Sequence, residues 1–224
     1  MSMDLNKLYA ARFPEEDLEK KAAIWKVLCE DFFQQFISPT DTVLDLGAGH
    51  GEFLCHIKCG KRIAVELNPE AGRWLPQDTR LIAKPSWEIN EVDSGSVNAV
   101  FASNFFEHLP TKDKLMQTLS EINRVLVPEG RLIILQPNLA YLTNQFFDFI
   151  DHHLPLSHKS MVEALCISSF EVMRCTPKFL PFTTKSRMPQ SPWLVRWYLR
   201  LPVAWRVLGK QMFILARKGR AEDK

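Results

Sequence analysis

Residues 43–54 read VLDLGAGHGEFL, a short apolar run that contains Asp45 and is followed by three glycines at alternate positions. An apolar run that leads into a glycine-rich turn is typical of a buried β-strand followed by a helix. Gly47 and Gly49 let the backbone turn tightly and let a ligand approach without a Cβ in the way, and Gly51 allows close packing where the helix begins. Ligands of open α/β sheets bind beyond the carboxyl ends of the strands, so this turn is the expected binding place.

Strand and helix patterns alternate outward from this stretch. The strand patterns cover residues 42–46, 62–67, 79–83, 97–103 and 131–136, and helices are predicted at 51–57, from Pro69, and at 112–125. Such alternation indicates βα units and a mostly parallel sheet with right-handed crossovers.

The flanking regions complete the predicted domain. One amphipathic helix is expected over residues 15–37, a helix over 160–166 and a strand over 169–175. Residues 193–209 are predicted to be helical with a break at Pro202, and 211–217 to be the last strand. Residues 176–192 contain four prolines and are predicted to be an ordered loop.

The second strand ends in Glu66, 19 residues after Gly47, where a carboxylate can accept hydrogen bonds from both hydroxyls of a ribose. A nucleoside-containing ligand is therefore expected, and the alternative is a plain βαβ turn with a surface Glu. The dinucleotide pattern G-x-G-x-x-G is not met, because the third glycine comes one place early and Glu52 would repel a pyrophosphate. Asp45 and Glu52 instead suit a cationic ligand such as S-adenosylmethionine.

With these residues in place, VLDLGAGHGEFL resembles the first motif of class I S-adenosylmethionine-dependent methyltransferases. The resemblance extends to IAVELN (63–68), SNFFEHLP (103–110) and EINRVLVPEGRLIILQPN (121–138), with a weaker match through HKSMVEALCISSFEV (158–172), as in the methyltransferase type 11 group. It implies a Rossmann-like, doubly wound α/β sheet of about seven strands whose last strand is antiparallel.

The resemblance also implies roles for individual residues. The cofactor-binding residues would be Asp45 near the amino group, Gly47, Ala48 and Gly49 along the methionine part, Glu66 at the ribose, Leu67 at the adenine, and Asn104 and Phe105 beside the reactive methyl. Many relatives carry an acidic motif after the third strand, where this chain has AKPSWEIN. Trp87 could stack on adenine there, and ordinary core packing is the alternative.

A hydroxyl acceptor needs a base with a pKa near neutrality, which makes histidine the usual choice. His108 follows the fourth strand in SNFFEHLP, where a structural role is the alternative. His152 and His153 follow the fifth strand in DFIDHHLPLSH, where an adjacent Asp can orient a ring. The predicted base is His152 or His153. A metal site on this Asp/His cluster is the rival interpretation, but the spacing does not match a known ligand pattern, so no metal is expected.

The C-terminal residues 174–224 hold 12 Lys or Arg and 2 Asp or Glu, a balance of +10 against −8 in the remainder. The segment also carries Trp193, Trp197, Tyr198 and Trp205 among Arg196, Arg200 and Arg206, which would suit a membrane surface or a phosphate-bearing lipid-linked substrate. The alternative is a helix packed on the sheet edge with its arginines in water.

A single domain is predicted. Residues 1–38 would form a helical cap around Trp25, 39–138 the cofactor-binding core, 139–210 the substrate-covering region and 211–217 the last strand. The expected acceptor is a hydroxyl of a sugar or lipid-linked glycan. The alternatives are an RNA or protein methyltransferase that docks through the basic segment, and a non-catalytic binding module.

Other features set the expected location and partners. Asn104-Phe105-Phe106 lacks the prolines of amino-directed nucleic-acid methyltransferases, so nucleic acid is not the expected partner. Without a recognisable signal peptide or apolar span, a cytoplasmic protein is expected, with contact at a membrane surface. Five irregularly spaced cysteines favour free buried thiols. The sequence gives no oligomeric state.

Overall fold

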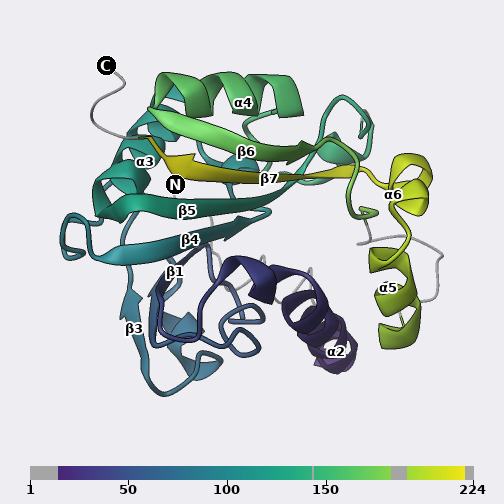
Figure 1. Cartoon of the computed structure of the whole chain (residues 1–224), viewed down its shortest axis with the longest axis horizontal. Helices are drawn as coiled ribbons and strands as arrows, with labels where there is room; N and C mark the ends of the chain where they lie inside the picture. Colours follow the sequence, from purple (N-terminus) through teal and green to yellow (C-terminus); the bar gives the residue numbers. More distant parts are fainter. Residues whose placement is uncertain (1–14, 143, 183–190, 220–224) are drawn as a thin grey trace.

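The computed structural model describes residues 15–142, 144–182 and 191–219, and within these ranges seven strands form one sheet (Figure 1). They are β1 (Thr42–Leu46), β2 (Lys61–Val65), β3 (Thr79–Ile82), β4 (Val97–Ser103), β5 (Leu126–Pro137), β6 (Phe170–Thr176) and β7 (Gln211–Lys218). Their order is β3-β2-β1-β4-β5-β7-β6, and the first five pair in parallel. β7 is antiparallel to both β5 and β6, which confirms the predicted fold class.

The helices lie on both faces of this sheet. The α-helices are α2 (Glu15–Asp31), α3 (Lys112–Val125), α4 (His158–Ile167), α5 (Pro192–Leu199) and α6 (Pro202–Leu208), and the 3₁₀ helices are η1 (Phe33–Phe36), η2 (Pro69–Arg73), η3 (Phe106–His108) and η4 (Gln145–Asp148). The predicted break at Pro202 is confirmed, since this proline starts α6. α2 and α5 lie side by side and are joined by an ion pair between Arg196 and Asp31 (Figure 1).

Alternation along the strands separates two apolar cores, one on each face of the sheet. Leu44 and Ile134 face the core that α3 and α4 cover, whereas their neighbours Val43 and Ile133 face the core that α2, α5 and α6 cover. Successive side chains of a strand point to opposite faces, and a sheet buried on both faces reads as a continuous apolar run. This is why VLDL and LIIL contain hardly any polar residue.

Two predicted helices differ from the structure. The helix predicted over 15–37 ends at Asp31, and the separate 3₁₀ helix η1 follows from Phe33 to Phe36, with Phe32 and Phe33 both buried. Phe32 packs on Phe179 with ring centroids 4.4 Å apart, and Phe33 on Phe101 at 5.0 Å. The helix predicted at 51–57 is only a set of turns, since the chain must already return to β2 at Lys61.

The five cysteines are free, as predicted, but only Cys29 is buried. Cys55 and Cys166 are exposed, so the prediction of buried thiols was wrong for them. Cys55 lies in the turns between β1 and β2, and Cys166 lies in α4.

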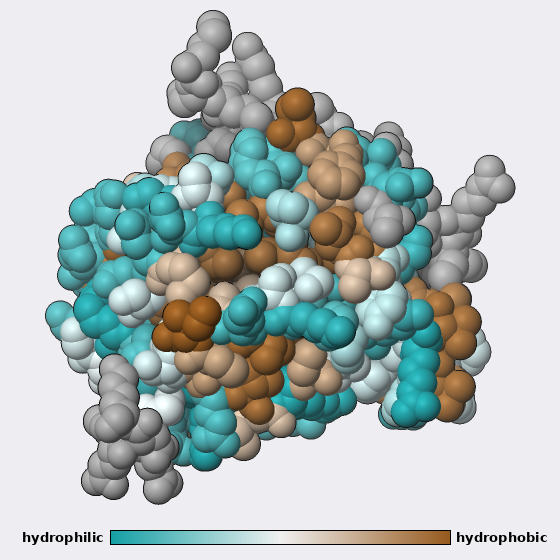
Figure 2. Space-filling model, turned by 90° about the horizontal axis from the view of Figure 1, so that it is seen from above, coloured by the Kyte–Doolittle hydropathy of each residue, from teal (hydrophilic) through white to brown (hydrophobic). Residues whose placement is uncertain are grey.

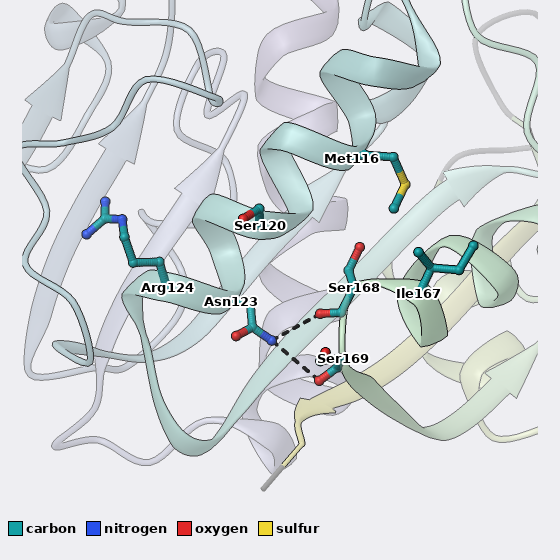
Figure 3. A pocket seen from close by; sticks show the side chains of 7 residues that line it. All are labelled: Met116, Ser120, Asn123, Arg124, Ile167, Ser168 and Ser169. Atoms are coloured by element: carbon teal, nitrogen blue, oxygen red, sulfur yellow. Dashed lines mark hydrogen bonds between the residues drawn. The ribbon is translucent and has the colours of Figure 1, made fainter. Parts of the chain in front are cut away.

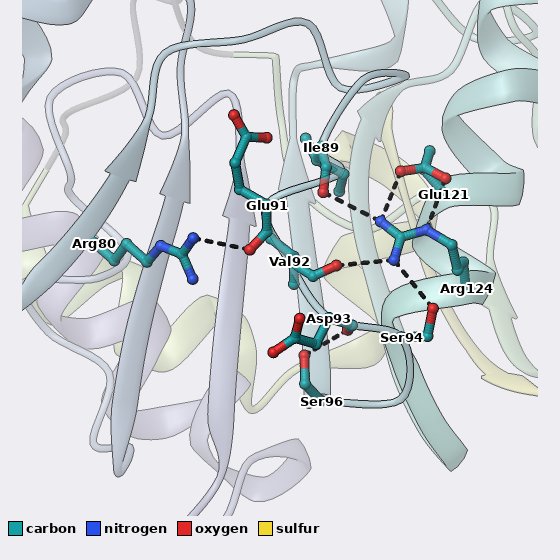
Figure 4. A network of polar contacts seen from close by, with 9 residues as sticks. All are labelled: Arg80, Ile89, Glu91, Val92, Asp93, Ser94, Ser96, Glu121 and Arg124. Atoms are coloured by element: carbon teal, nitrogen blue, oxygen red, sulfur yellow. Dashed lines mark hydrogen bonds and ion pairs between the residues drawn. The ribbon is translucent and has the colours of Figure 1, made fainter.

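The connection between β3 and β4 is fastened to α3 by Arg124 (Figure 4). Its guanidinium donates hydrogen bonds to the backbone oxygens of Ile89 (3.1 Å) and Val92 (2.8 Å), and it forms a two-bond ion pair with Glu121. Planar bidentate geometry of this kind fixes orientation as well as contact. The loop that follows β3, where the sequence places the adenine side of the ligand, is therefore held against the domain.

A surface groove lies along the C-terminal half of α3 (Figure 3). It is lined by Met116, Ser120, Asn123, Arg124, Ile167, Ser168 and Ser169. The C-terminal end of α3 leads directly into the start of β5, so this groove lies toward the amino ends of the parallel strands. Ligands of such sheets bind at the opposite, carboxyl ends.

Candidate active site

The glycine turn after β1 has the backbone that only glycine adopts readily. Gly47 and Gly49 have φ values of +69° and +52°, in the left-handed region. A Cβ on Gly47 would lie 2.6 Å from Cδ2 of Phe105, whereas a Cβ on Gly49 would meet nothing within 4 Å. The turn therefore packs closely under Phe105 at one glycine and opens onto free space at the next.

Glu66 closes this open space from the end of β2. Its side chain is 6 % exposed, and its two carboxylate oxygens accept hydrogen bonds from the backbone N–H of Gly49 and of Asn68, each at 3.0 Å. A carboxylate has about four lone-pair sites, so acceptor capacity remains on both oxygens for the hydroxyls of a ligand. Glu66 thus ties the turn to β2 and still presents an acceptor.

Asp45 lies at the end of β1, beneath the same turn, and is 3 % exposed. Burial raises its pKa well above the ordinary value, and the nearby Glu52 and Glu66 raise it further. The ionised form of a buried carboxyl group is stabilised by a nearby cation. The carboxylates of Asp45 and Glu66 therefore suit the positively charged ammonium and sulfonium of S-adenosylmethionine.

The expected negative potential from Glu52 is partly offset. Lys21 of α2 forms an ion pair with Glu52 at 2.6 Å. The charge of Glu52 still raises the pKa of Asp45, so Asp45, Glu52 and Glu66 all contribute negative potential at the glycine turn, with that of Glu52 partly offset by Lys21. The ion pair also fastens α2 beside the glycine turn.

The predicted adenine side contains Leu67 and Trp87. Leu67 is 52 % exposed, directly after Glu66, as a residue at the mouth of a site would be. Trp87 is half-buried and packs against the core on the α3 face, with the Lys114 ammonium 4.6 Å from the ring centre. This environment fits a Trp87 that packs in the core better than one that exposes a ring face for stacking on adenine.

The fourth strand delivers Asn104 and Phe105 next to the glycine turn, since β1 and β4 are neighbours in the sheet. Asn104 is exposed and has a φ of +47°, a conformation that Asn tolerates better than most residues. The strained Asn104 turns the chain sharply, so that Phe105 lies over Gly47 and η3 starts at Phe106.

Two of the predicted histidines come together just beyond this turn. The rings of His108 and His152 are 5.1 Å apart, although 44 positions separate them in the chain. Nδ1 of His108 lies 3.0 Å from the backbone oxygen and 3.1 Å from Oδ2 of Asp151, and Nδ1 of His152 lies 2.9 Å from the backbone oxygen of Phe146. Burial alone would lower the pKa of His108, but the hydrogen bond to Asp151 and the charge of Glu107 together raise it.

His153 does not join this pair. Its side chain is exposed, and only its backbone N–H takes part, donating at 2.8 Å to the backbone oxygen of Glu107. The N–H of Leu154 donates to the same oxygen at 3.0 Å. The backbone of His153 therefore joins the segment after β5 to η3, and its exposed imidazole is not among the groups gathered at His108.

Glu107 was missed as a functional residue. It is 1 % exposed, and neither of its carboxylate oxygens has a hydrogen-bond partner among the described residues. Burial raises its pKa, while the neighbouring His108 opposes that rise. Gln136 at the end of β5 lies close enough to affect that pKa, yet its amide makes no hydrogen bond of normal geometry either. The available signal was an acid inside the apolar stretch FFEHL.

Comparison with known proteins agrees with this arrangement. Residues 44–134 match the methyltransferase domain family of type 11. A search of curated protein sequences finds no match.

Solved structures share the fold. A Haloferax volcanii methyltransferase solved in complex with the Trm112 methyltransferase activator is 17 % identical, with a TM-score of 0.71 over 98 % of this chain and 100 % of that one. A SAM-dependent methyltransferase from Archaeoglobus fulgidus is 21 % identical, with a TM-score of 0.66 over 96 % and 100 %. A geranyl diphosphate C-methyltransferase from Streptomyces coelicolor, solved with S-adenosylhomocysteine, is 16 % identical, with a TM-score of 0.61 over 92 % and 87 %.

The matched segment runs from β1 to β5 and contains the glycine turn, Asp45, Glu66 and the end of β4. The chain carries a methyltransferase domain of this family over residues 44–134, in a sheet with the strand order and antiparallel last strand of class I S-adenosylmethionine-dependent methyltransferases.

Proposed function

We propose that this enzyme transfers the methyl group of S-adenosylmethionine to a hydroxyl of a sugar or of a lipid-linked glycan. The observation that carries the proposal is the position of the histidine cluster. It begins at Glu107, two residues after Phe105, and Phe105 lies on the glycine turn of the cofactor site. Groups able to take part in proton loss are thus next to the place where the methyl group would be offered.

The cofactor supplies an electrophilic methyl carbon, so the protein has to bind it, orient the acceptor and deal with one proton. In our proposal Glu66 accepts hydrogen bonds from the ribose, and Asp45 compensates the ammonium. Gly47, Ala48 and Gly49 line the methionine part, Leu67 borders the adenine, and Asn104 and Phe105 border the methyl group. The single domain with its predicted parts remains part of this proposal.

Acceptor activation is assigned to the cluster of Glu107, His108 and His152. An alcohol attacks only as it loses its proton, and histidine groups within hydrogen-bond reach can assist that loss. Asp151 holds the ring of His108 in one orientation, as the Asp of a catalytic triad does. Of the two bases predicted from the sequence, His152 is retained and His153 is set aside.

The lipid-linked form of the acceptor is supported by the surface of α5 and α6. Seven large apolar side chains are exposed there, and we call this the α5–α6 apolar surface; its members are Trp193, Leu194, Trp197, Leu201, Val203, Val207 and Leu208. Figure 2 shows apolar surface at the end of the molecule that carries these helices. No helix in the described ranges is both long and apolar enough to cross a membrane, so the proposed contact is peripheral.

The basic charge of the C-terminal segment is partly used inside the protein. Arg196 pairs with Asp31 at 2.7 Å, and Arg217 pairs with Glu129 and Glu171, each at 2.6 Å. Arg200 and Arg206 are exposed on the two helices of the α5–α6 apolar surface. This pattern favours a lipid headgroup or a phosphate over a long nucleic-acid track, which needs a continuous row of unpaired cations.

The test is transfer of a labelled methyl group. Purified enzyme is incubated with methyl-labelled S-adenosylmethionine and three acceptor pools: soluble glycans, lipid-linked glycans in vesicles, and total RNA with protein. We expect label in a glycan as a base-stable methyl ether. Label released by mild base would indicate a carboxyl ester, and label only in RNA or protein would overturn the proposal.

A further inference from the structure

The cluster at the end of β4 has the composition of a metal site. Glu107, His108 and His152 each place one potential ligand atom within 4.8 Å of the others. Ligand atoms around one tetrahedral zinc ion lie about 3.3 Å apart, given metal–ligand distances near 2.0–2.1 Å. The three groups would need to close by about 1.5 Å at most, which rotation of side chains can supply.

The contacts of Nδ1 in the two rings indicate which nitrogen carries the lone pair. Nδ1 of His108 and Nδ1 of His152 each face a backbone carbonyl oxygen, that of Asp151 and that of Phe146. A carbonyl oxygen only accepts, so Nδ1 carries the proton in both rings and Nε2 carries the lone pair. In metal-binding histidines the nitrogen that does not bind the metal commonly donates a hydrogen bond to a carbonyl or a carboxylate. Nδ1 of His108 also lies 3.1 Å from the carboxylate oxygen Oδ2 of Asp151.

Glu107 is the independent observation that points to a ligand. Its carboxylate is fully enclosed, and no described residue donates a hydrogen bond of normal geometry to either oxygen. A buried carboxylate is expected to be hydrogen-bonded, paired with a charge or bound to a metal. Direct metal coordination satisfies it without any further donor.

We propose that Glu107, His108 and His152 bind one divalent transition-metal ion, for which zinc is the reference. Two imidazoles and one carboxylate are the protein ligands of many catalytic zinc sites, which leave at least one coordination position open. Harder cations such as Mg²⁺ prefer oxygen ligands throughout, so they should bind this set poorly. The sequence predicted no metal, because its Asp/His cluster in 148–153 lacks a ligand spacing, and Glu107 and His108 come from a different strand end.

This inference refines the proposed function: with Nε2 of both histidines on the metal, the metal and not an imidazole would act on the acceptor hydroxyl, which would take the open position and lose its proton to water. A bound divalent cation lowers the pKa of a coordinated hydroxyl, which would ease loss of the acceptor proton. Metal binding itself does not depend on that role and is measured without any acceptor.

The experiment is metal titration of untagged protein that has been treated with a chelator and then freed of it. Zn²⁺ binding is measured by competition with a chromophoric chelator, and Co²⁺ is used as an optical substitute. We expect one equivalent of Zn²⁺, a visible Co²⁺ absorption without a thiolate charge-transfer band, and no comparable binding of Mg²⁺. A thiolate band would place the metal on cysteines and would overturn the proposal.

Variants locate the ion. Glu107→Gln and His152→Ala should each weaken Zn²⁺ binding by about 100-fold or more, since loss of even an outer partner commonly costs 10- to 100-fold. Asp151→Asn should weaken it by about 10- to 100-fold. His153→Ala, which removes the adjacent exposed imidazole, should leave the affinity unchanged. Circular dichroism and thermal melting of each variant show whether it is folded.

The outcomes separate this inference from the proposed function. Absence of stoichiometric Zn²⁺ binding by the wild-type protein, or equal affinity in wild type and Glu107→Gln, would overturn the metal site. Binding of S-adenosylhomocysteine and methyl transfer by the metal-free protein would still support the proposed function. Zn²⁺ binding that follows the variants, without methyl transfer to any glycan, would support the metal site and reject the acceptor.

Discussion

The two glycines of the cofactor turn provide a matched pair of substitutions that tests the site directly. Gly47→Ala and Gly49→Ala both force a side chain into the left-handed backbone region, where a residue other than glycine costs about 1–2 kcal/mol. They differ in what the new methyl group meets. At Gly47 it would lie 2.6 Å from Phe105, and at Gly49 it would meet nothing within 4 Å.

The structure therefore predicts different magnitudes. Gly49→Ala should lower the free energy of unfolding by about 1–2 kcal/mol, the backbone term alone. Gly47→Ala should lower it by about 2–5 kcal/mol, because displacing a packed ring adds about 1–3 kcal/mol. In a Phe105→Ala background the clash is gone, so the cost of Gly47→Ala should fall to the backbone term, a coupling of about 1–3 kcal/mol.

The assays are urea unfolding and calorimetric titration with S-adenosylhomocysteine. Gly49→Ala should remain folded and yet bind the ligand much more weakly, because its methyl group fills the space beside Glu66 where the ligand is proposed to lie. Wild-type affinity in folded Gly49→Ala would refute this placement of the cofactor. Equal destabilisation by the two glycine substitutions, with no coupling to Phe105, would refute the packing argument.

Three further predictions follow from the same site. Glu66→Ala should weaken S-adenosylhomocysteine binding by about 10- to 100-fold in calorimetry, since hydrogen bonds to a charged group contribute about 1.5–3 kcal/mol; unchanged affinity would remove Glu66 from the ribose. His152→Ala should reduce turnover by about two to four decades at unchanged cofactor affinity, whereas His153→Ala should not, and full turnover in both would remove the cluster from catalysis. Because the pKa of Asp45 is raised, its carboxyl group stays protonated at pH values where an ordinary Asp is ionised. The ammonium of the ligand favours the ionised form, so ligand binding should release one proton at pH values between the ordinary and the raised pKa. Calorimetry from about pH 5 to about pH 8 in buffers of different ionisation enthalpy measures that release, which Asp45→Asn should abolish.

Features that depend on a local pattern were predicted well from the sequence. The strands at 42–46 and 97–103 have the bounds of β1 and β4, and the helix at 112–125 has those of α3. β1 and β4 are buried on both faces and read as continuous apolar runs, α3 has the apolar period of a one-faced helix, and Oγ1 of Thr111 caps α3 by accepting a hydrogen bond from the N–H of Lys114. The glycine turn was equally clear because its conformational demand is met by glycine alone.

Features that depend on distant contacts were not predictable in the same way. No local pattern shows that Lys21 neutralises Glu52, or that His108 lies beside His152. The choice between His152 and His153 rests on which of two adjacent side chains turns inward, and the backbone hydrogen bonds to Glu107 decide it. Glu107 is buried because β5 and the segment after it pack against it. The residues next to Glu107 in the sequence give no sign of this packing.

Two groups of buried polar residues in the described ranges differ in how they are compensated. Ser86 and Thr118 are buried far from the glycine turn and hydrogen-bond each other at 2.8 Å, as a stable core requires. Glu107 and Gln136 are buried near the carboxyl ends of β4 and β5 without such a partner, and Asp45 is buried at the end of β1, where the nearby Glu52 and Glu66 raise its pKa. Burying an acid in this way destabilises the fold, so an arrangement that places two at one edge of the sheet is best explained by cations that bind there. The ammonium of the cofactor would compensate the first acid, and the proposed metal ion the second. Each would then stabilise the folded enzyme in proportion to its occupancy.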